Sequence, residues 1–252
     1  MPNDGVPFYL KIDNVSVSGG NTQNITDVWV QANSTNLGAY ELPCNFPVLE
    51  QNAVHFTVSA GVWQSGQSDT RVTYPFYLPD TFTINATPGL KYSRALQFKY
   101  VPAALFSFNE DFENGTDYSN MPQSASLDTN NQYGNHCGVI TVNSVDSNVV
   151  ATQVNAQAFS ITQGSEVWLE VDYKCTVPFW IGFNSIYSNE TNPYEVLLLL
   201  PRTNWSKVYI KLTDLMGQAH ADKYTLFFNA IKPVGYDGGG NVYLDNIKVV
   251  HF

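Results

Sequence analysis

Apolar and polar residues alternate with a period of two along most of this 252-residue chain, and this pattern constrains its fold more than any other feature. Successive side chains of a β-strand point to opposite faces, so alternation predicts strands with one face in a core. Turn-forming Gly, Pro, Asn and Asp residues separate these segments about every ten residues, as in β-sandwiches. One short helix is expected within residues 212–221. The clearest alternating segments are residues 8–12, 28–32, 56–62, 96–100, 167–174 and 207–212.

The composition supports an all-β protein. The chain has 15 Tyr and 15 Phe residues, and strands favour aromatic side chains. Charged residues make up 13% of the chain, against about a quarter in typical soluble domains. A low charge with many Asn, Ser and Thr residues is typical of an exported β protein.

The sequence predicts two domains. An alternating strand ends at Val101 and Pro102, and a polar, acidic segment follows at residues 108–115. We place the boundary between residues 104 and 105, which gives domains of residues 1–104 and 105–252. Both lengths suit a β-sandwich domain.

The formal net charge of −10 limits the possible partners. A nucleic-acid-binding protein needs a cationic face for the phosphates, and this sequence has no cluster of Lys and Arg. The longest unbroken aliphatic run is residues 196–200, far shorter than the roughly 20 residues that span a bilayer. We interpret this run as a strand that is covered on both faces or meets a partner.

The first residues do not look like a signal peptide, because residues 1–5 have no basic start and no apolar stretch. The composition nevertheless indicates export. We expect this polar start to be a tether that follows a removed signal or a lipidated cysteine. The expected location is the outer membrane, the cell surface or the periplasm.

No complete set of catalytic residues can be assembled. The four histidines are scattered, and neither an HExxH motif nor a Gly-x-Ser-x-Gly elbow occurs. A paired-carboxylate glycosidase stays open, because Glu166, Glu170, Asp172 and Glu195 lie in or near expected strands. Glu170 and Asp172 share one alternating face, which is more simply a solvated strand.

The three cysteines, Cys44, Cys137 and Cys175, have no metal-like spacing. We interpret them as small buried apolar residues, and their pairing is left open.

The second half contains three motifs in order. They are EDFE at residues 110–113, NWSKVYIKL at residues 204–212 and VYLDNIKV at residues 242–249. In this order they resemble the opening, middle and closing segments of carbohydrate-binding-module and galactose-binding-like jelly-roll domains. The resemblance covers about 145 residues and implies a jelly-roll for residues 105–252.

The first half resembles an immunoglobulin-like or transthyretin-like sandwich through the segment LGAYELP at residues 37–43. The two-domain layout and the abundance of Tyr and Asn are similar to surface lipoproteins of the Bacteroidota. That resemblance implies attachment to the outer membrane and binding of glycans or envelope assemblies. The sequence lacks the lipidated cysteine of those proteins.

The jelly-roll resemblance also implies a structural Ca²⁺ ion between the opening acidic segment and the closing aspartate. Calcium takes six to eight oxygen ligands from carboxylates and carbonyls. The residues that match by position are Glu110, Asp111, Glu113 and Asp245. The same residue types also commonly satisfy strand ends and turns, so the metal is one of two interpretations.

Aromatic side chains on outward strand positions or in loops are candidates for sugar binding. Sugar rings pack their CH groups on flat aromatic rings, while amides and carboxylates bind the hydroxyls. An alternative is that jelly-rolls bury such aromatics, and Trp205 suits a core position. The candidate ligand-binding residues are Trp180, Asn184, Tyr187, Tyr194 and Trp205.

Three functions are compared. The leading one is a non-catalytic cell-envelope protein that docks with an outer-membrane protein complex. The second is a glycan-binding module of a polysaccharide-utilisation system, and the third is a glycoside hydrolase.

Overall fold

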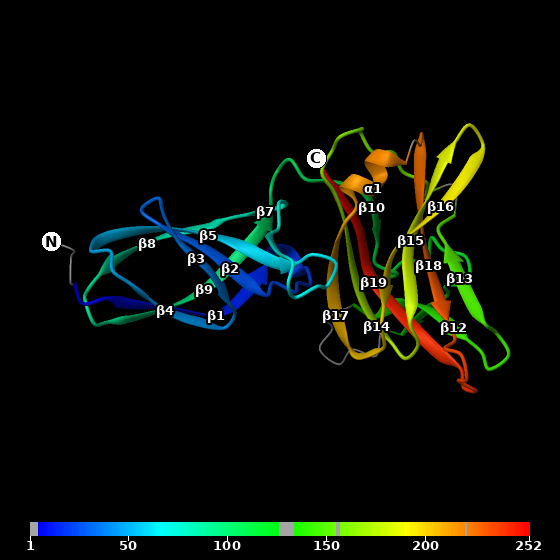
Figure 1. The fold of residues 1–252 in the computed structure, drawn as a ribbon, viewed down its shortest axis with the longest axis horizontal. Coiled ribbons are helices and arrows are strands. Elements are labelled where there is room, and N and C mark those ends of the chain that lie inside the picture. Colours follow the sequence, from blue (N-terminus) through cyan, green and yellow to red (C-terminus); the bar gives the residue numbers. More distant parts are fainter. Residues whose placement is uncertain (1–4, 126–133, 155–156, 220) are drawn as a thin grey trace. The chain divides into compact units, whose positions relative to one another are not determined.

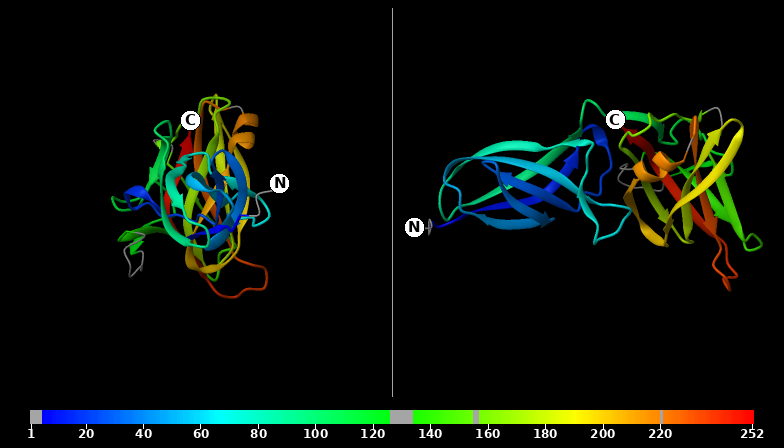
Figure 2. Two further views of the ribbon diagram at one scale, coloured as in Figure 1. Left: turned by 90° about the vertical axis from the view of Figure 1, so that its left-hand side faces the viewer. Right: turned by 45° about the horizontal axis from the view of Figure 1, so that its top comes forward.

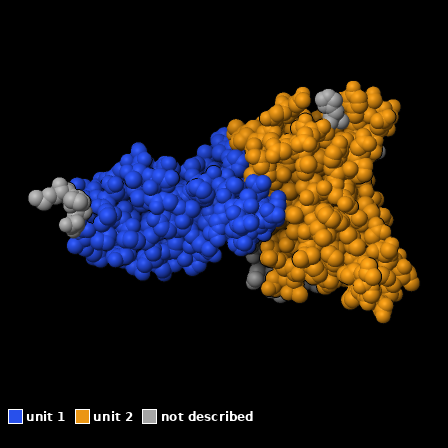
Figure 3. Space-filling view, viewed as in Figure 1, with its two compact units in different colours: residues 1–102 blue, residues 103–252 orange. Residues whose placement is uncertain are grey.

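The computed structural model describes residues 5–125, 134–154, 157–219 and 221–252. The chain is an all-β protein built from sandwiched sheets, as the alternation predicted (Figures 1 and 2). It divides into two compact units, Met1–Pro102 and Ala103–Phe252, which are coloured separately in Figure 3. The boundary expected between residues 104 and 105 lies close to this division. The immunoglobulin-like and jelly-roll assignments stay predictions.

Unit 1 consists of two sheets. The first has the strand order β4-β1-β9-β7, and the second has the order β3-β2-β5-β6 with β8 also paired to β5. The apolar residues of the alternating segments, such as Phe8, Val30, Phe56 and Phe98, are buried between the sheets. The elements are β1 (Phe8–Val17), a 3₁₀ turn (Ser18–Gly20), β2 (Asp27–Ala32), β3 (Thr35–Glu41), β4 (Cys44–Val48), β5 (Asn52–Trp63), β6 (Arg71–Thr73), β7 (Tyr77–Leu78), β8 (Asp80–Ala86) and β9 (Lys91–Tyr100).

Unit 2 is a larger sandwich. Its elements are β10 (Leu105–Glu110), β11 (Gln123–Ala125), β12 (His136–Val142), β13 (Asn148–Thr152), β14 (Val167–Cys175), β15 (Phe179–Tyr187), β16 (Glu190–Leu199), β17 (Arg202–Lys211), α1 (Thr213–Gln218), β18 (Lys223–Ile231) and β19 (Gly240–His251). The short helix α1 lies within the range expected from the sequence.

The two sheets of unit 2 enclose one apolar core. One sheet has the order β11-β12-β19-β14-β17 with β10 also paired to β19, and the other has the order β13-β18-β15-β16. Val171 and Val249 come from the first sheet, and Ile181, Phe183 and Phe228 come from the second. Each of these residues occupies an inward position of its strand, and inward positions recur at every second residue.

The opposite face of β14 is not a solvated strand, which corrects the sequence interpretation of Glu170 and Asp172. Both side chains are buried, together with Lys207 of β17. The Lys207 ammonium lies 3.0 Å from a Glu170 oxygen and 3.8 Å from an Asp172 oxygen. Burial alone would lower the pKa of Lys207, but the carboxylates of Asp172 and Glu170 outweigh it and raise that pKa. Alternation correctly placed Glu170 and Asp172 on the same face of the strand. Their charges alone did not reveal that this face is buried and that Lys207 pairs with both carboxylates.

Residues 196–200 belong mainly to β16, an edge strand. Leu198 and Leu200 are 38% and 66% exposed, so the interpretation of a strand covered on both faces is wrong. No helix among the described residues has the length and apolar character needed to cross a bilayer.

The three cysteines are all free thiols. Cys137 and Cys175 are buried, and Cys44 is half-buried. Burial raises the pKa of Cys137 to about 11, so its reactive thiolate form is scarce at neutral pH.

Candidate functional site

The outer face of the sheet β13-β18-β15-β16 carries the candidate site. On β15, Phe179, Ile181 and Phe183 point into the core, so Trp180 and Asn184 point outward. Outward positions of β15 lie beside outward positions of its neighbours β16 and β18, so residues far apart in the sequence lie side by side on this face. Trp180 pairs with Asn229 of β18 and with Leu198 of β16.

A hollow of about 440 Å³ lies over this face. Its size is within the range of about 300–1,000 Å³ that small-molecule sites commonly have. It is lined by Val150 and Thr152 of β13, Phe227 and Asn229 of β18, Asn184 of β15, and Pro193 and Glu195 of β16. The lining therefore combines apolar groups with amides, a hydroxyl and one carboxylate.

The floor of the hollow depends on Gly182. A Cβ atom at this position would lie 2.2 Å from the Phe227 ring and 2.5 Å from the Tyr194 carbonyl oxygen. The Phe227 ring therefore occupies the space that any side chain at position 182 would need. Phe227 is only 6% exposed, so it forms a fixed apolar floor to the hollow.

The two amides in the hollow are oriented by neighbouring strands. The Asn184 side-chain nitrogen donates to the Thr225 hydroxyl at 3.2 Å, and the Asn148 nitrogen donates to the Asn229 side-chain oxygen at 3.1 Å. These bonds leave the Asn184 oxygen and the Asn229 nitrogen without a hydrogen-bond partner within the described part of the chain. The Glu195 carboxylate likewise has no ion-pair or hydrogen-bond partner there. One acceptor, one donor and one anion are thus available to a ligand.

The structure brings only two of the five predicted ligand-binding residues together on this face. Trp180 and Asn184 lie there, but Tyr194 points inward and stacks on Phe183 with ring centroids 5.0 Å apart. Tyr187 ends β15 and lies at the rim of another hollow. Trp205 lies on β17 of the other sheet, with the Lys174 ammonium 4.9 Å from the centre of its ring.

The sequence predicts an outward or loop position for Tyr194, and the structure corrects this prediction. The structure begins β16 at Glu190, so Tyr194 falls on an inward position of a strand. Sequence reasoning also missed Phe227 and Asn229 as members of the site. The alternation in the sequence could have identified them, because both residues alternate with Leu226 and Phe228, which are buried in the core.

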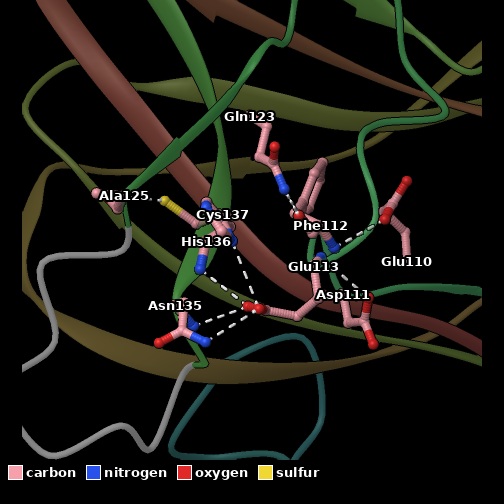
Figure 4. Close-up of polar contacts among 9 residues, drawn as sticks. All are labelled: Glu110, Asp111, Phe112, Glu113, Gln123, Ala125, Asn135, His136 and Cys137. Atoms are coloured by element: carbon pink, nitrogen blue, oxygen red, sulfur yellow. Dashed lines mark hydrogen bonds and ion pairs between the residues drawn. The ribbon is translucent and has the colours of Figure 1, made fainter.

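Three of the four predicted calcium ligands, Glu110, Asp111 and Glu113, accept hydrogen bonds from backbone nitrogens (Figure 4). The two Glu110 oxygens accept bonds from the backbone nitrogens of Phe112 and Asp117, both at 2.8 Å. One Glu113 oxygen accepts from the backbone nitrogens of Asn135 and His136, also at 2.8 Å. Glu110 and Glu113 therefore tie the opening segment together in this structure.

Glu113 shows the effect of these bonds on its ionisation. Burial alone would raise its pKa, but the hydrogen bonds from His136 and Asn135 outweigh burial and hold the pKa below its ordinary value. The carboxylate therefore stays ionised and clamps the start of β12 to the opening segment.

Asp245 differs from the other predicted ligands. Its side chain is 1% exposed, and one oxygen accepts a 2.7 Å bond from the Asn246 backbone nitrogen. The other oxygen has no hydrogen-bond partner among the described residues. Burial raises the pKa of Asp245 to about 8, against the lowering effect of the Asn246 bond, and Asp172 adds to the rise.

Within the described ranges, no three His, Cys, Asp or Glu side chains form a group that could hold a metal ion. The four predicted ligands do not converge as a set, because Glu110 and Glu113 direct their oxygens to backbone nitrogens. Of the four, Asp245 offers a buried oxygen that no described residue contacts by a hydrogen bond. Calcium binding therefore stays a prediction.

Comparison with known proteins gives likeness of fold only. No family model matches the chain, and no curated protein matches it. Among solved structures, it is similar to the CBM22-1–GH10 modules of xylanase 10B from Clostridium thermocellum, complexed with xylohexaose. That match has 15% identity and a TM-score of 0.43, and it covers 58% of this chain and 28% of the xylanase chain.

Two further structures show a similar degree of likeness. A family 11 carbohydrate-binding module from Clostridium thermocellum, in complex with a mixed-linked tetrasaccharide, has 13% identity and a TM-score of 0.38. That match covers 58% of this chain and 94% of the module. An exo-β-agarase has 12% identity and a TM-score of 0.41, with coverage of 56% and 24%. The present chain spans about a quarter of the xylanase and agarase structures.

Proposed function

We propose that this chain is a non-catalytic, exported protein that binds a carbohydrate in the hollow on the outer face of the sheet β13-β18-β15-β16. The observation that carries the proposal is the lining of this hollow, where Asn184, Asn229 and Glu195 surround the apolar floor of Phe227. Sugars present both CH faces and hydroxyl groups, and this lining offers a partner for each.

The position of the hollow suits an extended ligand. It lies on the exposed face of a sheet, and Leu198 and the half-buried Trp180 continue the apolar surface beside Asn229. A ligand longer than the hollow can therefore continue over Trp180 and Leu198 on the same face of the sheet. This arrangement favours an internal stretch of a glycan chain.

The lining does not favour a paired-carboxylate hydrolase. Such enzymes place two carboxyl groups about 5–10 Å apart on either side of the scissile bond. Glu195 is the one carboxylate among the described lining residues of the hollow. Glu170 and Asp172 lie on the other sheet, where Lys207 binds both.

Docking with an outer-membrane protein complex, as a lipid-anchored surface protein of a Bacteroidota cell, is the second candidate. The exposed Leu198 and Leu200 at the edge strand β16 favour it, because apolar groups on an edge strand suit a protein interface. Pull-down from outer membranes with the wild-type chain and with Leu200→Ser tests this candidate. Recovery of one envelope protein by the wild type alone supports docking.

Affinity electrophoresis and isothermal titration against a panel of soluble neutral polysaccharides test glycan binding. The variant Glu195→Ala removes the carboxylate of the hollow and is expected to weaken binding about tenfold, which corresponds to roughly 1.4 kcal/mol. The matched control is Glu190→Ala, which removes an exposed carboxylate at the start of the same strand. Absence of binding to every polysaccharide, or equal losses in the two variants, would contradict the proposal.

A further inference from the structure

A second hollow of about 250 Å³ is lined in part by residues of α1. Figure 1 shows α1 at one end of unit 2, and we call this hollow the end hollow. Its floor consists of the buried residues Val167, Met216, Ala219 and Tyr224. Its rim comes from residues 161–165, from the end of β15 and from the residues before β18. It shares no lining residue with the hollow on the outer face of the sheet.

The walls of this end hollow are fixed by hydrogen bonds. The Tyr224 hydroxyl lies 3.2 Å from the Met216 carbonyl oxygen and 3.1 Å from that of Ala219, which ties the end of α1 to β18. At the start of α1, the Thr213 hydroxyl oxygen accepts a 3.0 Å bond from the Val167 backbone nitrogen. A hollow with such walls is formed before a ligand arrives, which lowers the entropy cost of binding.

The rim carries polar side chains that make no hydrogen bond or ion pair with the described residues. The Asp222 carboxylate and the Gln163 amide make no hydrogen bond or ion pair with any described residue, and both residues are exposed. Thr162 and Ser165 add hydroxyl groups to the same lining. Tyr187, 51% exposed, adds an aromatic ring. Acceptors, donors and an aromatic ring thus face one small space.

We propose that the end hollow binds a single uncharged sugar ring, either a free monosaccharide or the end of a glycan chain. The volume is below the range of about 300–1,000 Å³ for drug-sized ligands, so it suits one ring. A carboxylate and an amide bind ring hydroxyls, and the aromatic ring packs on the CH groups.

The charge of the ligand follows from the lining. Asp222 is its one charged group among the described residues, and the whole chain carries a net charge of −10. Both disfavour uronates and sulfated sugars.

The ligand class is the same as in the proposed function, a carbohydrate, but the end hollow is a separate site from the hollow on the sheet. Asn184 of the first hollow and Tyr187 of this one are three residues apart on β15. Three residues of a strand span about 10 Å, so the two hollows are separated by about this distance along β15.

The test is an amide chemical-shift titration of the full ¹⁵N-labelled chain with the methyl glycosides of glucose, galactose, mannose, xylose and N-acetylglucosamine. We expect at least one of them to shift the amides of Gly164, Gly217 and Ala221 saturably, with Thr152 and Asn229 unchanged. Shifts confined to Thr152 and Asn229, or no saturable shift with any of the five sugars, would overturn the proposal.

Variants assign the binding to the end hollow. Asp222→Ala is expected to raise the dissociation constant about tenfold or more, because it removes a charged hydrogen-bond acceptor. Asp222→Asn keeps one acceptor oxygen, so its dissociation constant is expected to lie between those of Asp222→Ala and the wild type. Asp237→Ala is the matched control, since it removes an exposed aspartate from the loop between β18 and β19 at the opposite end of the unit. Equal effects of Asp222→Ala and Asp237→Ala would contradict the assignment.

Glu195→Ala separates this proposal from the proposed function. The variant is expected to weaken polysaccharide binding at the sheet hollow and to leave the monosaccharide titration unchanged. If monosaccharides bind at the end hollow and no polysaccharide binds, the proposed function fails and this inference stands. If polysaccharides bind and the amides of the end hollow do not shift, the reverse holds.

Discussion

Asp245 is the residue at which burial and ionisation conflict most clearly. Its carboxyl group is 1% exposed, and one oxygen has no hydrogen-bond partner among the described residues. With its pKa raised to about 8, it is protonated in the folded chain at neutral pH. In the unfolded chain the same group ionises near its ordinary pKa of 3.8. The folded state therefore holds a proton that the unfolded state releases.

The consequence for stability has a definite sign. Because the folded state binds more protons between about pH 4 and pH 8, Asp245 makes the free energy of unfolding fall as the pH rises through this window. Asp245→Asn cannot ionise and keeps an oxygen for the Asn246 bond. In a chelator-containing buffer, this variant is expected to gain stability over the wild type from pH 5 to pH 8, by at most ~1.4 kcal/mol per pH unit. Urea unfolding at several pH values measures the gain, and a constant difference would contradict it.

The same variant tests the predicted calcium ion. A cation at Asp245 would favour its ionised form and remove the cost of burying it, so millimolar calcium should raise the melting temperature of the wild type. Asp245→Asn should lose most of that rise. An unchanged melting temperature of the wild type in calcium would count against a metal at this position.

At the scale of elements, the strand pair β14–β17 depends on a buried charge group. Lys207 lies directly opposite Asp172 in the ladder, and its ammonium also reaches Glu170. Removing one partner of a buried ion pair leaves an uncompensated charge, which typically costs about 3–5 kcal/mol.

Lys207→Met is therefore expected to lower the free energy of unfolding by about 3–5 kcal/mol in urea titrations. The control is Lys211→Met on the same strand, where the ammonium lies 3.3 Å from Glu166 and both side chains are 30% exposed. This half-exposed pair should contribute less than about 1 kcal/mol. Similar losses in the two variants would mean that the buried group has no special role in stability.

At the scale of the whole molecule, the net charge of −10 and the isoelectric point near 4.6 affect every ligand that approaches it. Like charges lower the rate and the strength of association, and salt screens this effect over about 10 Å at 0.1 M. The lining of the sheet hollow, with Glu195 as its charged group among the described residues, acts in the same direction.

Two derivatives of one glucan backbone test this expectation. If the chain binds hydroxyethylcellulose, which is neutral, it should bind carboxymethylcellulose, which is anionic, more weakly at low salt. The difference should narrow as the ionic strength rises, because screening removes the repulsion. Affinity electrophoresis in gels of each polymer measures both effects. Tighter binding to the anionic polymer would show that a cationic surface controls recognition.

The sequence alone determined most of the strands and the direction of most of their side chains, with Tyr194 of β16 as an exception. A period of two fixes which residues share a face, so alternation is enough to assign Phe179, Ile181 and Phe183 to the core, where they are buried. The short helix before β18 was predictable in the same local way. These features depend on residues that are close together in the sequence, so the sequence shows the relevant side chains directly.

Only the tertiary structure decided which outward residues meet. Asn184, Glu195 and Asn229 come from three strands, and the strand order β18-β15-β16 brings them to one hollow. The burial of Glu170 was equally out of reach, because a charged outward position looks the same whether it is solvated or paired. Strand order and register join residues that are distant in the chain, and alternation carries no information about them.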